Sequence, residues 1–152
     1  MILFLDFDGV LHGVGRPKFE NLPRLEAVLR DFPEIDVVIS SSWRESYSWD
    51  VIVDFFAEDL QPRIVGMTPV IATKWPPYPR QVRHEEILLF LKERDIGNRP
   101  WIILDDDPSL FCPDCKELML CDPGNGLDEA GEARLRARLH LFTRGVTERK
   151  AS

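Results

Sequence analysis

The sequence has no apolar run that approaches the roughly 18 residues of a membrane-spanning helix. Its apolar opening, residues 1–5, is interrupted by Asp6 and follows no basic segment, so it is too short for a secretory signal peptide. We therefore expect a soluble, cytoplasmic protein without a membrane partner.

Cysteine is also scarce. Cys112, Cys115 and Cys121 fall close together, and an odd number does not fit the evenly paired disulfides of a small secreted domain. The first two have the CxxC spacing of half a zinc site, which the third and a histidine could complete. No second CxxC occurs and no histidine lies nearby in sequence, so we expect a turn between two strands with reduced, partly buried thiols.

Positive charge is in the minority. Lys and Arg number 19 against 26 Asp and Glu, and the net charge is -7. Because nonspecific binding to nucleic acid or anionic lipid depends on clustered positive charge, this balance excludes a broad interaction of that kind but leaves room for a local basic site. Five of the 26 acidic residues are the pair Asp6 and Asp8 and the run at residues 105–107, and carboxylates grouped in this way bind divalent cations.

The chain shows no internal repeat, no low-complexity segment and no linker long enough to separate two domains. Its 152 residues match the size of one α/β domain, so we expect a single domain over residues 1–152.

Apolar runs and apolar periodicity alternate along the chain. Short apolar runs predict buried strands at residues 2–7, 35–39, 64–65, 101–104 and 118–120. Helical spacing predicts helices at residues 22–30, 49–60, 82–93 and 127–142, and Asn21 is a candidate N-cap of the first. This alternation predicts an α/β fold with a doubly wound, mainly parallel sheet.

Polar residues follow three of these strands: Asp6 and Asp8, the serines 40–42, and the aspartates 105–107. The carboxyl ends of strands form the ligand crevice of an open α/β sheet, so these groups are expected to converge although they are far apart in sequence.

The three segments together resemble the haloacid dehalogenase (HAD) superfamily of hydrolases. The segment DFDGVL at residues 6–11 is similar to its first motif, VVISSS at residues 37–42 to its second, and IILDD at residues 102–106 to its fourth. The SSWR at residues 41–44 together with LDD at residues 104–106 resembles the HAD domain of Swiss Army Knife RNA repair proteins.

The resemblance implies a magnesium-dependent phosphatase. Asp6 would be the nucleophile that forms an aspartyl phosphate, and Asp8 would be the general acid and base. The metal ligands would be Asp6, the backbone carbonyl of Asp8, Asp106 directly, and Asp105 in a secondary or water-mediated role. Asp107 is expected to cap the following turn.

Two motif positions have alternatives. Ser41 is the predicted hydroxyl ligand of the phosphoryl group, with Ser40 and Ser42 as close rivals. The third motif needs a cation that stabilises phosphoryl charge, and Arg83 fits it, with Lys74 and Arg80 as alternatives.

The segments between the motifs are too short for the cap domain that many relatives use to enclose small metabolites, so a minimal or absent cap and an open active site are expected. Lys74, Arg80 and Arg83 could line one edge of such a crevice, which makes a nucleotide, a phosphorylated nucleic-acid end or a phosphoprotein a plausible substrate. The competing interpretation is a non-catalytic domain that binds a phosphorylated ligand, or a receiver-like phosphoacceptor. A receiver would carry an acidic pair after its first strand and its phosphoacceptor after the third, whereas DxD comes first here.

Overall fold

A five-stranded sheet forms the centre of the fold. The computed structural model describes residues 1–72 and 81–150, with side chains up to residue 143. The strand order is β3-β2-β1-β4-β5, and every neighbouring pair is parallel. The strands are β1 (Ile2–Leu5), β2 (Asp36–Ile39), β3 (Ile64–Met67), β4 (Trp101–Asp105) and β5 (Leu118–Leu120). The predicted doubly wound α/β fold is confirmed.

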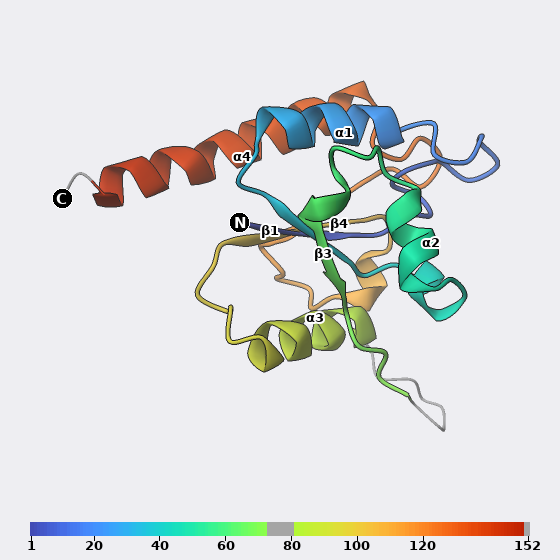
Figure 1. The fold of residues 1–152 in the computed structure, drawn as a ribbon, viewed down its shortest axis with the longest axis horizontal. Coiled ribbons are helices and arrows are strands. Elements are labelled where there is room, and N and C mark those ends of the chain that lie inside the picture. The colour runs from blue at the N-terminus through green and yellow to red at the C-terminus, as the bar shows by residue number, and fades with distance from the viewer. Residues whose placement is uncertain (73–80, 151–152) are drawn as a thin grey trace.

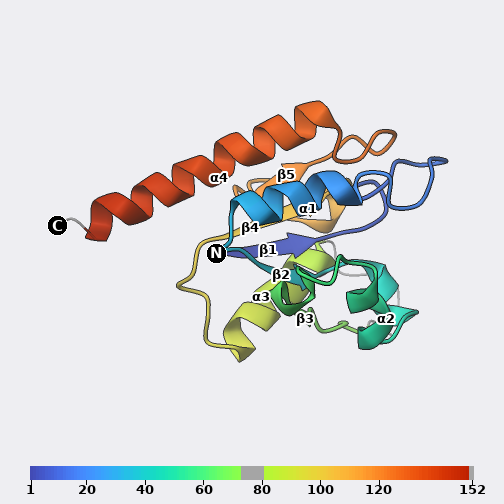
Figure 2. The same cartoon turned by 45° about the horizontal axis from the view of Figure 1, so that its top comes forward.

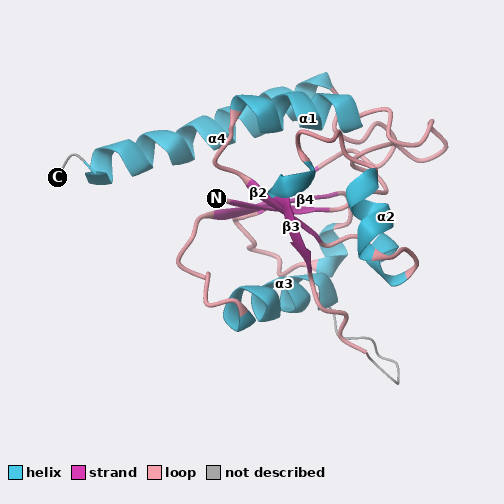
Figure 3. Cartoon of the chain, in the orientation of Figure 1, coloured by secondary structure: helices cyan, strands magenta, loops and turns pink. Residues whose placement is uncertain are grey.

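Helices cover both faces of this sheet. They are α1 (Leu22–Asp31), α2 (Trp49–Asp54), α3 (Val82–Glu93) and α4 (Glu129–Lys150). Figure 1 and Figure 2 show α1 and α4 side by side on one face and α3 on the other. In Figure 3 the strands lie between these helical layers, and α2 lies beyond one end of the sheet. None of the described helices has the length and apolarity needed to cross a membrane.

The side chains of β1 alternate between two buried cores, which explains why this strand has no polar position. Leu3 and Leu5 pack in the core that includes residues of α1 and α4, whereas Ile2 and Phe4 pack in the core that includes residues of α3. The next residue in the second series is Asp6. Alternation therefore directs the Asp6 side chain towards α3.

Two helices differ from their predicted bounds. The helix expected at residues 49–60 ends at Asp54, because Phe55 and Phe56 lie in turns where their rings pack against Phe7. Their apolar spacing reflects this packing and not further helical turns. The last helix begins at Glu129, later than expected, and continues to Lys150.

Asn21 occupies the N-cap position of α1, as predicted, but its side chain does not cap the helix. Its backbone angles are φ -95° and ψ -5°, and its side chain makes no capping hydrogen bond. The amide instead donates to the carbonyl oxygens of Val10 at 3.3 Å and Asn125 at 2.8 Å. Asn21 therefore connects the loop after β1 to the turn before α4, while Pro23 gives the helix a preorganised first turn.

The carboxyl ends of β2, β1 and β4 lie level in the middle of the sheet. Leu5 pairs with Ile39 on one side and with Leu104 on the other. The ladder continues past these pairs, because the Ser40 N–H donates to the Leu5 carbonyl and the Asp6 N–H to the Leu104 carbonyl, each at 3.0 Å. The residues that follow these three strands thus meet at one edge.

Candidate active site

Three carboxylates converge where β1 and β4 end. One oxygen each of Asp6, Asp105 and Asp106 lies within 4.8 Å of the others. Asp6 is 5% exposed and Asp105 is 0% exposed. The Phe7 N–H donates to Asp6 Oδ1, and the Asp107 N–H donates to Asp105 Oδ1, both at 2.9 Å. Buried like charges repel one another, so this cluster favours the binding of a cation.

Arg83, in the first turn of α3, contacts two of these carboxylates. Its Nη1 lies 2.9 Å from Asp6 Oδ2 and 2.6 Å from Asp105 Oδ2. Burial alone would lower the pKa of Arg83, but the charges of Asp6 and Asp105 outweigh burial and raise it. The structure therefore brings together the predicted nucleophile and the predicted third-motif cation. The alternatives Lys74 and Arg80 lie outside the described residues.

One guanidinium among three carboxylates leaves excess negative charge, and the pKa values reflect it. Burial first, and then the charge of Asp6, raise the pKa of Asp105 to about 6 against the opposing effect of Arg83. Burial and the charge of Asp6 also raise the pKa of Asp106. Deprotonating the whole cluster is therefore unfavourable unless a further cation is present.

The donor set of the cluster fits a magnesium ion, because carboxylate oxygens are the hard ligands that Mg²⁺ prefers. Asp6, Asp105 and Asp106 are the side chains that could hold it. Both oxygens of Asp105 already accept hydrogen bonds. Arg83 donates to Oδ2, and the Asp107 N–H donates to Oδ1. Asp106 is therefore the more available ligand of the two, as the fourth-motif prediction supposes. Asp107 caps the next turn by accepting from the backbone of residue 109, as predicted.

Gly9 lets the loop after β1 approach Asp106 closely. Its φ is +71°, a conformation that side-chain-bearing residues rarely adopt. A Cβ atom at this position would also overlap the carboxyl group of Asp106. The glycine that follows DxD is thus required for both backbone conformation and space.

Asp8 lies outside the buried cluster, and its side chain is 62% exposed. His12 Nε2 lies 3.0 Å from Asp8 Oδ1, and the Trp43 indole N–H donates to Asp8 Oδ2 at 2.8 Å. His12 Nδ1 accepts the Phe19 N–H at 3.5 Å, which leaves Nε2 as the proton-bearing nitrogen that donates to Asp8. Sequence reasoning missed this orienting role of His12, although its position four residues after Asp8 was an available signal.

The serines after β2 occupy different environments. Ser40 and Ser41 are each 0% exposed, whereas Ser42 is exposed. The Ser41 hydroxyl accepts a 3.4 Å bond from the backbone two residues ahead and caps the short 3-10 turn that follows. Alternation along β2 directs Ser40 to the same side as Asp6, and its hydroxyl has no hydrogen-bond partner among the described residues. The phosphate-binding role of Ser41 stays a prediction, and Ser40 stays its closest rival.

A buried ion pair that sequence reasoning missed supports this edge of the sheet. Arg44 Nη2 lies 2.5 Å from Glu86 Oε2, and the side chains are 4% and 6% exposed. Arg44 also donates to backbone carbonyls at the ends of β2 and β3, and Glu86 accepts the Ile71 N–H. The pair therefore joins these strand ends to α3, the helix that carries Arg83.

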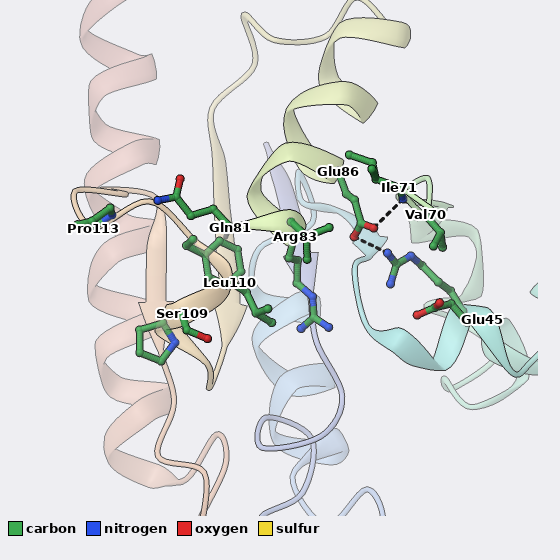
Figure 4. Close-up of a pocket in the computed structure, with 13 residues that line it drawn as sticks. Glu45, Val70, Ile71, Gln81, Arg83, Glu86, Ser109, Leu110 and Pro113 are labelled. Carbon is green, nitrogen blue, oxygen red and sulfur yellow. Dashed lines mark hydrogen bonds and ion pairs between the residues drawn. The ribbon is translucent and has the colours of Figure 1, made fainter. Parts of the chain in front are cut away.

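A cleft of about 980 Å³ adjoins the carboxylate cluster at Arg83. Figure 4 shows Arg83 between two walls, with Leu110 and Pro113 on one side and Glu86 and Val70 on the other. Within residues 1–72 and 81–150, no inserted cap domain separates the motifs. The arrangement is that of an open site with α3 along one edge.

Trp43, which donates to Asp8, is part of a pair of stacked aromatic side chains. Trp43 stacks on Tyr47 with ring centres 5.2 Å apart and planes 27° apart, and Tyr47 is 39% exposed. Lys18 Nζ lies 5.3 Å from the centre of the Trp43 ring. This group places a flat apolar surface and a positive charge next to the outer carboxylate.

Most of the chain is similar to a known protein family. A family model described as the HAD domain in Swiss Army Knife RNA repair proteins matches residues 2–131. That range includes Asp6, Asp8, Arg83, Asp105 and Asp106. No curated protein and no solved structure matches the chain.

Proposed function

Because the chain belongs to the family of HAD domains in Swiss Army Knife RNA repair proteins, which suggests hydrolase activity, we propose that it is a magnesium-dependent phosphatase. The observation that carries the proposal is the contact of Arg83 with Asp6 beside Asp105 and Asp106. A carboxylate can attack a phosphoryl group only if the negative charge of both is partly neutralised, and this arrangement provides the groups that do so.

In the first step, an oxygen of Asp6 attacks phosphorus and the bond from phosphorus to the leaving oxygen breaks. Asp8 donates its proton to that oxygen, so the products are an aspartyl phosphate and a free alcohol. In the second step, the Asp8 carboxylate takes a proton from water as the water attacks phosphorus. Phosphate leaves, Asp6 is regenerated as a carboxylate, and Asp8 is again protonated.

The other side chains hold this geometry. Arg83 keeps the Asp6 oxygen in place and faces the phosphoryl charge, and His12 and Trp43 fix the Asp8 carboxylate. A magnesium ion bound by the carboxylate cluster would supply the remaining neutralisation of charge.

For the substrate, we propose a nucleic acid with a terminal phosphate, with a nucleotide or a phosphoprotein as alternatives. The matched family is described by its occurrence in RNA repair proteins. The open cleft leaves room for a long chain, and the exposed Tyr47, which stacks on Trp43, and Lys18, which lies over Trp43, offer an aromatic ring and a phosphate-attracting charge near Asp8.

The experiment is a panel of phosphate esters that includes mononucleotides and oligonucleotides with 3′- or 5′-phosphates, assayed with and without Mg²⁺. We expect multiple turnovers, loss of release in chelator, and higher kcat/KM for an oligonucleotide than for the matching mononucleotide. The alternative functions predict different results, because a receiver-like domain would release at most one phosphate per chain and a binding domain none. Undiminished turnover by folded Asp6→Asn protein would contradict the proposed chemistry.

A further inference from the structure

A second cluster of metal-ligating side chains lies outside the carboxylate site. His84 is in the first turn of α3, and Cys112 and Cys115 are in the turn between β4 and β5. One ligand atom of each lies within 4.8 Å of the others, and all three residues are half-buried. The turn and its partly buried thiols are as the sequence predicts, but the fold brings to them a histidine that is 28 residues away in sequence.

The imidazole of His84 lies against the turn that carries the two thiols. Its Nδ1 accepts a hydrogen bond from the Cys112 N–H at 3.2 Å, so Nδ1 carries no proton and its lone pair is engaged in that bond. Metal binding through Nδ1 would replace this hydrogen bond. Neutral imidazole is the form that binds metals. The Cys115 N–H in turn donates to the Cys112 carbonyl at 3.1 Å, and this tight turn holds the two thiols on the same side.

We propose that His84, Cys112 and Cys115 bind a zinc ion, in a site separate from the proposed catalytic metal. Zinc bonds of about 2.3 Å to sulfur and about 2.0 Å to nitrogen imply ligand atoms roughly 3.5–3.8 Å apart at tetrahedral angles. The ligand atoms lie within 4.8 Å of one another, so the side chains would have to approach by up to roughly 1 Å to reach that geometry. Soft thiolates select zinc over magnesium, whereas the all-oxygen cluster around Asp6 has the opposite preference.

The fourth position is taken by water or by Glu117, whose carboxylate Oε2 lies 3.9 Å from the Cys115 sulfur. Cys121 does not belong to the site, because it is buried in the other core. A redox role for the CxxC pair is the alternative, and the metal titration described below distinguishes the two.

Zinc binding at His84, Cys112 and Cys115 would connect the two walls of the cleft. Residues 108–111 and 113 line one wall, and α3 contributes residues of the other, including Arg83 next to His84. A zinc ion shared by His84 and the two cysteines would join these walls and fix the turn of α3 from which Arg83 reaches Asp6. The site does not depend on the proposed phosphatase activity, because it shares no ligand with that centre.

Cobalt binding tests the inference directly. The reduced full-length protein, stripped with chelator, is titrated with Co²⁺ and then Zn²⁺. We expect one equivalent of Co²⁺ with the near-ultraviolet thiolate charge-transfer band and the visible bands of tetrahedral cobalt, and displacement of that cobalt by Zn²⁺. The Cys112→Ser, Cys115→Ser and His84→Gln variants should bind zinc more than about 100-fold more weakly, since even the loss of an outer partner costs up to that amount.

Three variants serve as controls. Cys121→Ala and His140→Gln remove a cysteine and a histidine outside the cluster, and Asp6→Asn disables the carboxylate site. All three should keep the thiolate band. If a cysteine variant fails to fold, the spectrum and zinc content of the wild-type protein still decide the question.

Either of two results would overturn the inference. One is bound cobalt without a thiolate band, which would assign the metal to the carboxylates. The other is reduced protein that takes up no zinc but forms a Cys112–Cys115 disulfide, which would make the thiols a redox pair.

Discussion

Replacing Arg83 with methionine should destabilise the protein in a pH-dependent way. The substitution keeps much of the side-chain volume but leaves Asp6 and Asp105, which are 5% and 0% exposed, without the cation that contacts both. Removing one partner of a buried ion pair typically costs about 3–5 kcal/mol. Because Arg83 is itself 12% exposed, we expect about 3 kcal/mol near pH 7.5 in the absence of metal, the lower end of that range.

The destabilisation of the Arg83→Met protein should be smaller at acid pH. The pKa of Asp105 is raised to about 6, so near pH 5 this carboxyl group is mostly protonated and one of the uncompensated charges disappears. Urea unfolding of wild-type and Arg83→Met protein measures the loss of stability near pH 7.5 and its decrease near pH 5. Phosphatase kcat/KM should fall about 100- to 1,000-fold, the usual cost of removing a group that stabilises transition-state charge.

Arg94→Met is the matched control, because Arg94 lies at the end of the same helix and packs over Phe90 without touching the carboxylates. It should change stability and activity little. An Arg83→Met protein as stable as wild type near pH 7.5, or equally destabilised at both pH values, would refute the electrostatic account of the cluster.

Three further predictions concern the surroundings of the cluster. Gly9→Ala should weaken magnesium binding, measured by calorimetry, because the added Cβ would displace Asp106. Gly15 is the control, because it has a similar positive φ but no atom within 4 Å of an added Cβ, so Gly15→Ala should lower folding stability by only about 1–2 kcal/mol through backbone strain. His12→Gln should lower kcat about 10-fold with little change in KM, because His12 orients the proton-transferring Asp8 and not the phosphate; equal changes in both constants would argue for a role in binding. The folded-state pKa of Asp105 lies above its unfolded value, so the contribution of this group to stability is present below pH 4 and is lost as pH rises to about 6. Bound Mg²⁺ should reverse that loss, so the increase in melting temperature on adding Mg²⁺ should be larger near pH 7.5 than near pH 5.

The parts of the fold that local pattern determines were predictable from the sequence. The apolar run of β1 reads as a strand because both of its faces are covered, and the bounds of α3 follow from its apolar spacing. The convergence of polar groups after three strands follows from the parallel sheet alone, since the carboxyl ends of its strands share one edge.

Contacts between distant side chains were not predictable, because no periodicity encodes them. Arg44 and Glu86 are 42 residues apart, and nothing in either segment indicates that they pair. The approach of His84 to Cys112 depends on how α3 packs against the turn before β5, which only the assembled fold determines. Asn21 is a residue type that favours N-caps, but its side chain donates instead to the distant backbone carbonyl of residue 125.

Phosphoryl transfer to Asp6 is tested most directly by mixing the protein with Mg²⁺ and a substrate that carries a radiolabelled terminal phosphate, quenching in acid within one turnover, and mapping the protein-bound label. We expect a hydroxylamine-sensitive acyl phosphate on the peptide that contains Asp6, dependent on Mg²⁺ and absent from folded Asp6→Asn protein. Turnover with no protein-bound phosphate at any quench time, or label on a residue other than Asp6, would contradict Asp6 as the nucleophile.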